Sequence, residues 1–261
     1  MVKPKRTDGE PRATDFVESL DRGLKLLQAF GERPSPMTLS EIADLTSLPR
    51  ATARRILLTL QHGGYVASDG KMFAPTPHVL TLAGSYLRSN QLVAVLQPVL
   101  DEIATHAQEI SSLAVLDGQE VVFIARGSPT RIFSGGVDIG YRLPAFCTAV
   151  GRAMLGRLGD TELKAKLTAM KCEALTPHTL TDPKRLLAAI AADRARGYSL
   201  VDREAEPHFR SIAVPVKRYD GTIVAAVNIG AHVDRVSTEE MVKRFLPLLR
   251  RHAAQVAQKL V

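Results

Sequence analysis

Residues 38–66, TLSEIADLTSLPRATARRILLTLQHGGYV, contain two helical patterns separated by a tight turn. Thr38 and Glu41 form a capping box, in which a hydroxyl group and a carboxylate satisfy the free backbone donors at a helix start. Pro49 suits the first turn of the second helix because its missing N–H has no partner there. The stretch therefore predicts helix, turn, helix, with Ser47 in the turn.

Three arginines, Arg50, Arg54 and Arg55, crowd the second of these helices. At about 100° per residue, one side of this helix is apolar. That side is formed by Ala53, Ile56, Leu57 and Leu60. The arginines fall outside it, although a basic helix face is more often a solvated face than a binding surface. The elements that flank the helix must decide between these two interpretations.

The flanking elements favour DNA binding. Apolar residues recur at helical spacing over residues 17–30, and the turn at residues 68–70 predicts a two-stranded hairpin over residues 65–74. Helix, helix, turn, helix, hairpin is the order of a winged helix-turn-helix, whose recognition helix enters the major groove. The predicted DNA-contacting residues are Ser47, Arg50, Ala51, Thr52, Arg54, Arg55, Thr59 and Lys71.

The rest of the chain predicts four segments. Residues 1–15 are a polar tail expected to be disordered, residues 16–77 form the winged helix-turn-helix, and residues 78–90 form a linker helix. Residues 91–261 alternate helical patterns with strand patterns joined by Asp-Gly turns. We expect an α+β fold here, with an antiparallel sheet flanked by helices.

The composition limits the classes of partner and of cellular location. The formal charge is +7, from 34 Lys and Arg against 27 Asp and Glu, which favours polyanionic partners. Two separated cysteines, Cys147 and Cys172, are expected to be free thiols in a reducing compartment. The chain has neither a signal-peptide pattern nor about 18 consecutive apolar residues, so it is expected to be cytoplasmic and not bound to a membrane.

Several motifs together resemble the IclR family of bacterial transcriptional regulators. They are the opening stretch, VESLDRGLKLLQAF before it, RLPAFCTAVGRAMLG, GYSLVDREAEPHFRSIAVPV and IVAAVNIGAHVDRVS. The later motifs look most like the branch that regulates protocatechuate, 4-hydroxybenzoate and β-ketoadipate catabolism. The resemblance implies a GAF-like C-terminal effector domain, and a homodimer or dimer of dimers on a palindromic double-stranded operator.

The resemblance also implies a pocket for a small carboxylate effector. Its lining would include Thr148, Ala149, Val150 and Gly151 at a helix start, where backbone N–H groups suit a carboxylate. Ser211 matches a pocket cysteine of some relatives, and Asn228 and Gly230 match hydroxyl side chains. Val201 stands where relatives that bind small ketoacids have a carboxylate, although Asp202 adjoins it. Arg142 has two interpretations, a partner of the effector carboxylate or an anchor of its own loop.

Two other functions compete with that of a regulator that senses an aromatic acid or a β-ketoadipate-pathway intermediate. An enzyme would need a nucleophile such as Cys147 with His178 or His208, but no catalytic motif surrounds these residues. A protein-interaction module would use the winged helix without DNA. The sequence shows neither metal-ligand spacing nor GxGxxG order in GGVDIG at 135–140, so neither a metal nor another cofactor is expected.

Overall fold

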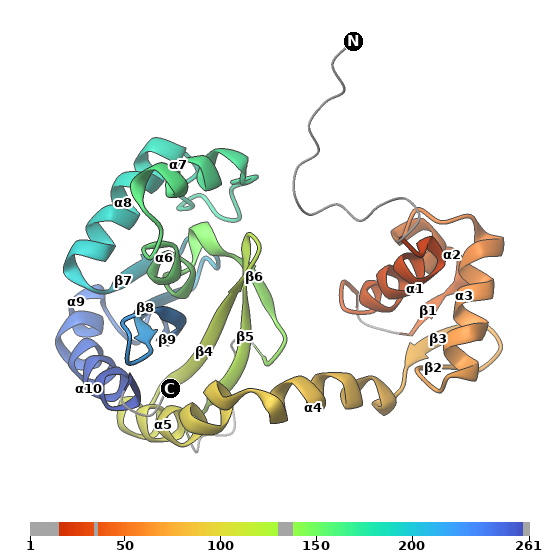
Figure 1. Cartoon of the computed structure of the whole chain (residues 1–261), viewed down its shortest axis with the longest axis horizontal. Coiled ribbons are helices and arrows are strands. Elements are labelled where there is room, and N and C mark those ends of the chain that lie inside the picture. The colour runs from red at the N-terminus through yellow and green to blue at the C-terminus, as the bar shows by residue number, and fades with distance from the viewer. Residues whose placement is uncertain (1–15, 34–35, 130–137, 258–261) are drawn as a thin grey trace, which may run out of the picture. The chain divides into compact units, whose positions relative to one another are not determined.

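The computed structural model of the chain describes residues 16–33, 36–129 and 138–257 (Figure 1). The chain divides into two compact units, Met1–Tyr86 and Leu87–Val261. The fold is mixed α+β, as predicted. The predicted tail and residues 135–137, half of the glycine-rich segment at 135–140, lie outside the described residues.

The N-terminal unit is the predicted winged helix-turn-helix. Its elements are α1 (Glu18–Ala29), β1 (Met37–Thr38), α2 (Leu39–Leu45), α3 (Arg50–His62), β2 (Val66–Ser68) and β3 (Met72–Pro75). The Thr38 hydroxyl accepts a hydrogen bond from the Glu41 amide at 3.3 Å, and the Thr38 amide donates to the Glu41 carboxylate at 2.7 Å. The capping box is therefore formed, and α2 begins where it was predicted to begin.

A small apolar core holds the three helices of this unit together. Leu26 of α1, Ile42 of α2, and Ala53 and Leu57 of α3 are all fully buried in it. The strand β1 was not predicted, because two residues carry no periodicity. It exists through its antiparallel pairing with β3, which places β3 between β1 and β2 in a three-stranded sheet.

A helical segment leads from this unit to the next along the chain. It consists of the 3-10 turn η1 (Pro77–Val79) and the helix α4 (Leu80–Ser89). Thr76 caps the segment by accepting a hydrogen bond from the His78 amide at 3.2 Å. The division between the two compact units falls within α4.

The C-terminal unit is built on a six-stranded antiparallel sheet in the order β6-β5-β4-β9-β8-β7. Its strands are β4 (Ile110–Asp117), β5 (Glu120–Gly127), β6 (Arg142–Pro144), β7 (Ser199–Asp202), β8 (Phe209–Lys217) and β9 (Ile223–His232). Its helical elements are α5 (Gln91–Ala107), η2 (Ala145–Cys147), α6 (Ala149–Leu155), α7 (Asp160–Ala169), α8 (Pro183–Arg196), α9 (Thr238–Glu240), η3 (Met241–Phe245) and α10 (Leu246–Ala257). No helix in the described part of the chain is both long enough and apolar enough to span a membrane.

Helices cover both faces of this sheet, so the unit has two apolar cores (Figure 1). Alternation along a strand assigns neighbouring residues to opposite faces. Ile212 packs in the core beneath α5 and α10, whereas Ala213 packs in the core beneath α6, α7 and α8. The cavity described below opens on the α6 side.

Glycine at position 151 lets α6 approach the preceding 3-10 turn closely. A Cβ atom added there would lie 2.1 Å from the Ala145 carbonyl oxygen and 2.5 Å from the Ala145 Cα atom. These are backbone atoms, so the helix itself would have to move. Gly151 thus fixes the position of α6 against the 3-10 turn that precedes it.

We predict that Gly151→Ala lowers the free energy of unfolding by about 1–3 kcal/mol, because overpacking forces the backbone apart. In thermal denaturation this would lower the midpoint by about 2–4 °C per kcal/mol. Gly23→Ala is the control, because Gly23 also lies within a helix and its added Cβ would meet only Ile56 Cγ2 within 4 Å, at 4.0 Å. Equal midpoints for Gly151→Ala and the wild type would show that α6 does not depend on this contact.

Candidate nucleic-acid interface and ligand cavity

The outer face of α3 carries exposed cations. Arg50, Arg54 and Arg55 are all exposed, and none of their guanidinium groups has an ion pair with the residues that the structure describes. The helix contains no Asp or Glu that could neutralise them. Arg50 lies in the first turn of α3, where a cation opposes the helix dipole, so its charge there does not stabilise the helix. A face of this kind is suited to phosphate oxygens and to base edges in the major groove.

The other residues predicted to contact DNA surround this face. Thr52 and Thr59 line a groove between α1 and α3 together with Arg55, whereas Arg50 and Arg54 do not line it. Ser47 is exposed in the turn before α3 and has a φ of 53°, in the left-handed region. Ala51 is exposed on α3, and Lys71 is exposed in the turn between β2 and β3. All eight predicted residues therefore belong to α3, the turn before it, or the wing.

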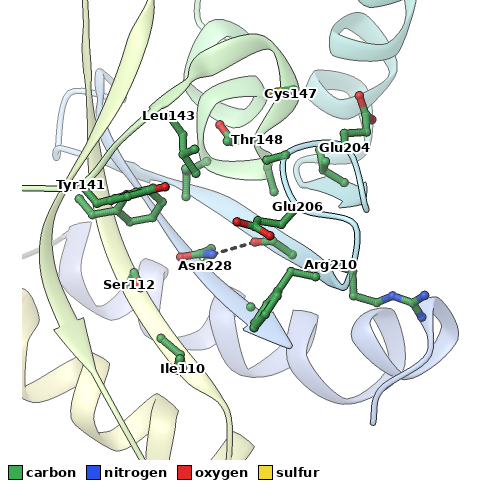
Figure 2. Close-up of a pocket in the computed structure, with 18 residues that line it drawn as sticks. Ile110, Ser112, Tyr141, Leu143, Cys147, Thr148, Glu204, Glu206, Arg210 and Asn228 are labelled. Atoms are coloured by element: carbon green, nitrogen blue, oxygen red, sulfur yellow. Dashed lines mark hydrogen bonds between the residues drawn. The ribbon is translucent and has the colours of Figure 1, made fainter. Parts of the chain in front are cut away.

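A cavity of about 300 Å³ lies in the C-terminal unit between the sheet and the start of α6 (Figure 2). This volume is at the small end of the range for ligand pockets. Most of its surface is apolar, with Phe123, Leu143, Val150, Val201 and Phe209 among the lining residues. The size and lining suit a small ligand with an apolar body.

Six of the nine predicted effector residues line this cavity. They are Thr148, Ala149, Val150, Ser211, Asn228 and Gly230. The first three come from the start of α6, and the last three from the strands β8 and β9. Asn228 donates a hydrogen bond from Nδ2 to Ser211 Oγ at 2.7 Å. The structure thus brings together segments that are far apart in the sequence.

Arg142 does not line the cavity. It lies on β6, where it donates to the Glu120 carboxylate and the Asp117 carboxylate, both at 2.8 Å. These two hydrogen bonds also raise the pKa of Arg142. Of its two interpretations, this geometry supports the loop anchor and not the partner of an effector carboxylate.

Asp202 and Gly151 are also outside the cavity lining. Val201 points into the cavity, and strand alternation turns Asp202 to the opposite face, where it accepts from Arg210 Nε at 2.9 Å. Asp202 therefore cannot replace the carboxylate that relatives carry at the position of Val201. Gly151 packs against the backbone of Ala145, as described above.

A buried ion pair holds the wall of the cavity in place. Arg152 of α6 donates to the Glu204 carboxylate at 2.7 Å and to the Phe146 carbonyl oxygen at 2.8 Å. The Leu180 amide donates to the same Glu204 oxygen at 2.8 Å. Arg152 and Glu204 are 4% and 9% exposed, so the pair ties α6 to the loop after β7 with little screening by water. The sequence alone did not single out this pair.

The cysteine beside the cavity is fully buried. Burial, reinforced by the nearby charge of Glu204, raises the pKa of the Cys147 thiol to about 12. Such a thiol is protonated near neutral pH and is a poor nucleophile. Among the described residues, no group of three His, Cys, Asp or Glu side chains is placed to hold a metal ion.

Sequence reasoning missed most of the apolar wall and two acidic side chains at the cavity. Phe123 comes from β5, Tyr141 immediately precedes β6, and Leu143 belongs to β6. Glu204 and Glu206 come from the loop after β7. Ser112 of β4 was also missed, although it pairs directly with Asn228 of β9. Only the pairing of strands distant in sequence could have revealed these neighbours.

Two family models match this chain. The model described as the IclR helix-turn-helix domain matches residues 19–70, and the model of the bacterial transcriptional regulator IclR C-terminal domain matches residues 84–258. Together they cover the winged helix-turn-helix and the unit that holds the cavity.

Known relatives agree with these matches. The Pca regulon regulatory protein of Pseudomonas putida is 43% identical over 92% of this chain and 82% of its own length. A structure of a transcriptional regulator from Rhodococcus, RHA06195, is 43% identical with a TM-score of 0.82, over 94% of this chain and 98% of that one. The inducer-binding domain of the Acinetobacter PobR transcription factor, a double mutant solved with 3-hydroxybenzoic acid, is 31% identical with a TM-score of 0.62, over 66% of this chain and 100% of that one.

The Pca and PobR proteins fall in the branch that the sequence motifs resemble. The winged helix-turn-helix, the sheet-and-helix unit and both family models lead to the same assignment. This chain belongs to the IclR family of bacterial transcriptional regulators.

Proposed function

We propose that this regulator binds a palindromic operator through its N-terminal unit and a small organic acid in the cavity of its C-terminal unit. The observation that carries the proposal is the exposed, unneutralised arginine face of α3. The proposed assembly is a homodimer or a dimer of dimers, because a two-fold axis matches the two half-sites of a palindrome. Operator binding places the proposed activity in the cytoplasm.

The effector is proposed to be an aromatic acid or an intermediate of the β-ketoadipate pathway. The apolar lining of the cavity supports a ligand with an apolar body, and its small volume supports a ligand of about one ring. The PobR domain bound to 3-hydroxybenzoic acid supports the same class of ligand. The catabolic genes of such compounds are the proposed targets.

An effector changes operator occupancy only if it has different affinities for different conformations or assemblies of the protein. We propose residues 16–77 as the DNA-binding domain, residues 78–90 as the coupling helix and residues 91–261 as the effector and oligomerisation domain. The continuity of α4 across the division between the two compact units supports this role for residues 78–90.

We propose that the chain is not an enzyme. Its relatives are transcriptional regulators, and the raised pKa of Cys147 disfavours nucleophilic catalysis at the cavity. The two histidines that could serve as its base, His178 and His208, do not line the cavity.

For DNA binding, we predict that Arg54→Ala and Arg55→Ala weaken operator affinity while stability stays within about 0.5 kcal/mol. A lost base contact should cost about 1–3 kcal/mol and relax sequence preference at one base pair, and a lost phosphate contact should lower the salt slope by about one. Fluorescence anisotropy over a salt series measures both effects, on an operator selected from random DNA by the wild type.

Lys164→Ala, an exposed change of the same charge on α7, is the matched control and should bind as the wild type does. If both arginine variants kept wild-type affinity and sequence preference, α3 would not present the recognition face. If the wild type showed no salt-dependent, sequence-selective binding to DNA, a protein-interaction module would be the better interpretation.

For effector binding, we predict that Ser211→Leu abolishes the response to the ligand and leaves basal operator binding intact. The added side chain fills part of the cavity and removes the acceptor of the Asn228 hydrogen bond. The measurement is the rise in thermal midpoint with aromatic acids and β-ketoadipate-pathway intermediates, because a ligand that prefers the folded state stabilises it. Thr161→Leu, an exposed site on α7, is the control, and a full response from Ser211→Leu would remove Ser211 from the site.

For the buried thiol, we predict that iodoacetamide at pH 8 alkylates Cys172 of the native protein and leaves Cys147 unmodified. Cys172 is partly exposed, whereas Cys147 is buried and stays protonated well above pH 8. Mass spectrometry of native and denatured samples measures the fraction of each cysteine that is alkylated. Rapid alkylation of native Cys147 would reopen the enzyme interpretation.

A further inference from the structure

The sheet forms a polar floor in the otherwise apolar cavity. Asn228 of β9 pairs in register with Ser112 of β4, and Ser211 of β8 pairs with Gly230, two residues further along β9. Because residues two apart in a strand share a face, these positions lie on one surface. The floor consists of Ser112, Ser211, Asn228 and Gly230.

The amide of Asn228 leaves one hydrogen-bonding atom unused. Its Nδ2 atom donates to Ser211 Oγ at 2.7 Å, the bond dashed in Figure 2. Its Oδ1 atom is buried and has no hydrogen-bond donor among the described residues. Asn228 as a whole is only 8% exposed, so little water reaches it. A buried acceptor without a donor is unfavourable. A donor supplied by a molecule in the cavity would relieve this cost.

Gly230 leaves room for a molecule to reach the amide. A Cβ atom added at Gly230 would have Asn228 Nδ2 at 3.9 Å and the Arg210 carbonyl oxygen at 4.0 Å as its nearest neighbours. No tighter contact restricts this side of β9. The absence of a side chain at Gly230 therefore leaves the floor accessible to a ligand in the cavity.

The charged lining residues do not provide a cation at the floor. The Arg210 guanidinium donates to Asp202 and to the Val236 carbonyl oxygen, both at 2.9 Å, and Figure 2 shows it directed away from Asn228. Glu204 is neutralised by Arg152. A carboxylate placed against Asn228 Oδ1 would therefore meet another acceptor oxygen without a compensating charge. A neutral donor such as a hydroxyl group fits this position.

We propose that Asn228 Oδ1 accepts a hydrogen bond from a ring hydroxyl group of the effector, so that Asn228 selects hydroxylated over unsubstituted aromatic acids. This inference rests on the proposed effector function of the cavity. The ring lies between apolar walls that include Phe123, Val150 and Val201, and the carboxylate end of the ligand points away from the floor. A linear dicarboxylate is disfavoured, because it would bring its second carboxylate to the floor.

The first test compares ligands of similar shape by isothermal titration of the full-length protein at pH 8. The probes are 4-hydroxybenzoate, which has a hydroxyl donor, and 4-fluorobenzoate, which does not. We expect 4-hydroxybenzoate to bind at least about tenfold more tightly, because a site built to pair a hydroxyl group rejects an analogue without it. Equal affinities would overturn the proposal.

The second test changes the amide. Asn228→Leu removes the acceptor and should abolish the preference for 4-hydroxybenzoate, leaving the two ligands within about twofold of each other. Asn228→Asp keeps an acceptor and should retain the preference. If Asn228 instead donated to the ligand, Asn228→Asp would lose the preference, and that result would overturn the proposal. Thermal midpoints measured without ligand show whether each variant is folded.

A third arm separates failure of this inference from failure of the proposed effector function. Gly230→Leu fills the space above β9 and should abolish binding of 4-hydroxybenzoate, which locates the ligand in the cavity. Suppose that 3-oxoadipate bound to the wild type but not to Gly230→Leu, and that 4-hydroxybenzoate bound to neither protein. The cavity would then be the effector site, and the hydroxyl inference would be wrong. If neither acid bound, the effector function itself would fail.

Discussion

The hydrogen-bonded ladder that joins β4, β9 and β8 determines which side chains meet the cavity. These strands lie in the middle of the sheet, and helices cover both of its faces. Alternation sends Ile212 and Ile229 to the core of α5 and α10, and it sends Ser211 and Asn228 to the opposite face. A shift of one residue would exchange the two faces, so apolar packing on one side fixes the polar floor on the other.

The buried pair of Arg152 and Glu204 complements this ladder at the cavity wall. Removing one partner of such a pair typically costs about 3–5 kcal/mol, because the other charge is left buried and unpaired. Here each charge has a further partner, the Phe146 carbonyl oxygen for Arg152 and the Leu180 amide for Glu204. The pair thus holds α6, the 3-10 turn before it and the loop after β7 in one arrangement around the ligand space.

The N-terminal unit follows a different principle, in which a small core supports a charged outer face. Leu57 and Ala53 fix α3 against its neighbours, and the capping box fixes where α2 begins. Arg50, Arg54 and Arg55 contribute nothing to that core, and Arg50 lies in the first turn, where the dipole disfavours cations. Placing these arginines on α3 does not stabilise the fold, which is expected of side chains that bind the phosphates of a partner.

The sequence alone determined the helices, the hairpins and the exposed side of α3, because these follow from local periodicity, capping and turn residues. The motifs of the family resemblance also indicated Ser211 and Asn228. Only the tertiary structure showed that Arg142 pairs with Glu120, that Asp202 turns away from the cavity, and that Asn228 keeps an unpaired acceptor. These features depend on which strands pair and in which register, and such contacts join residues whose separation in the chain leaves no local pattern to read.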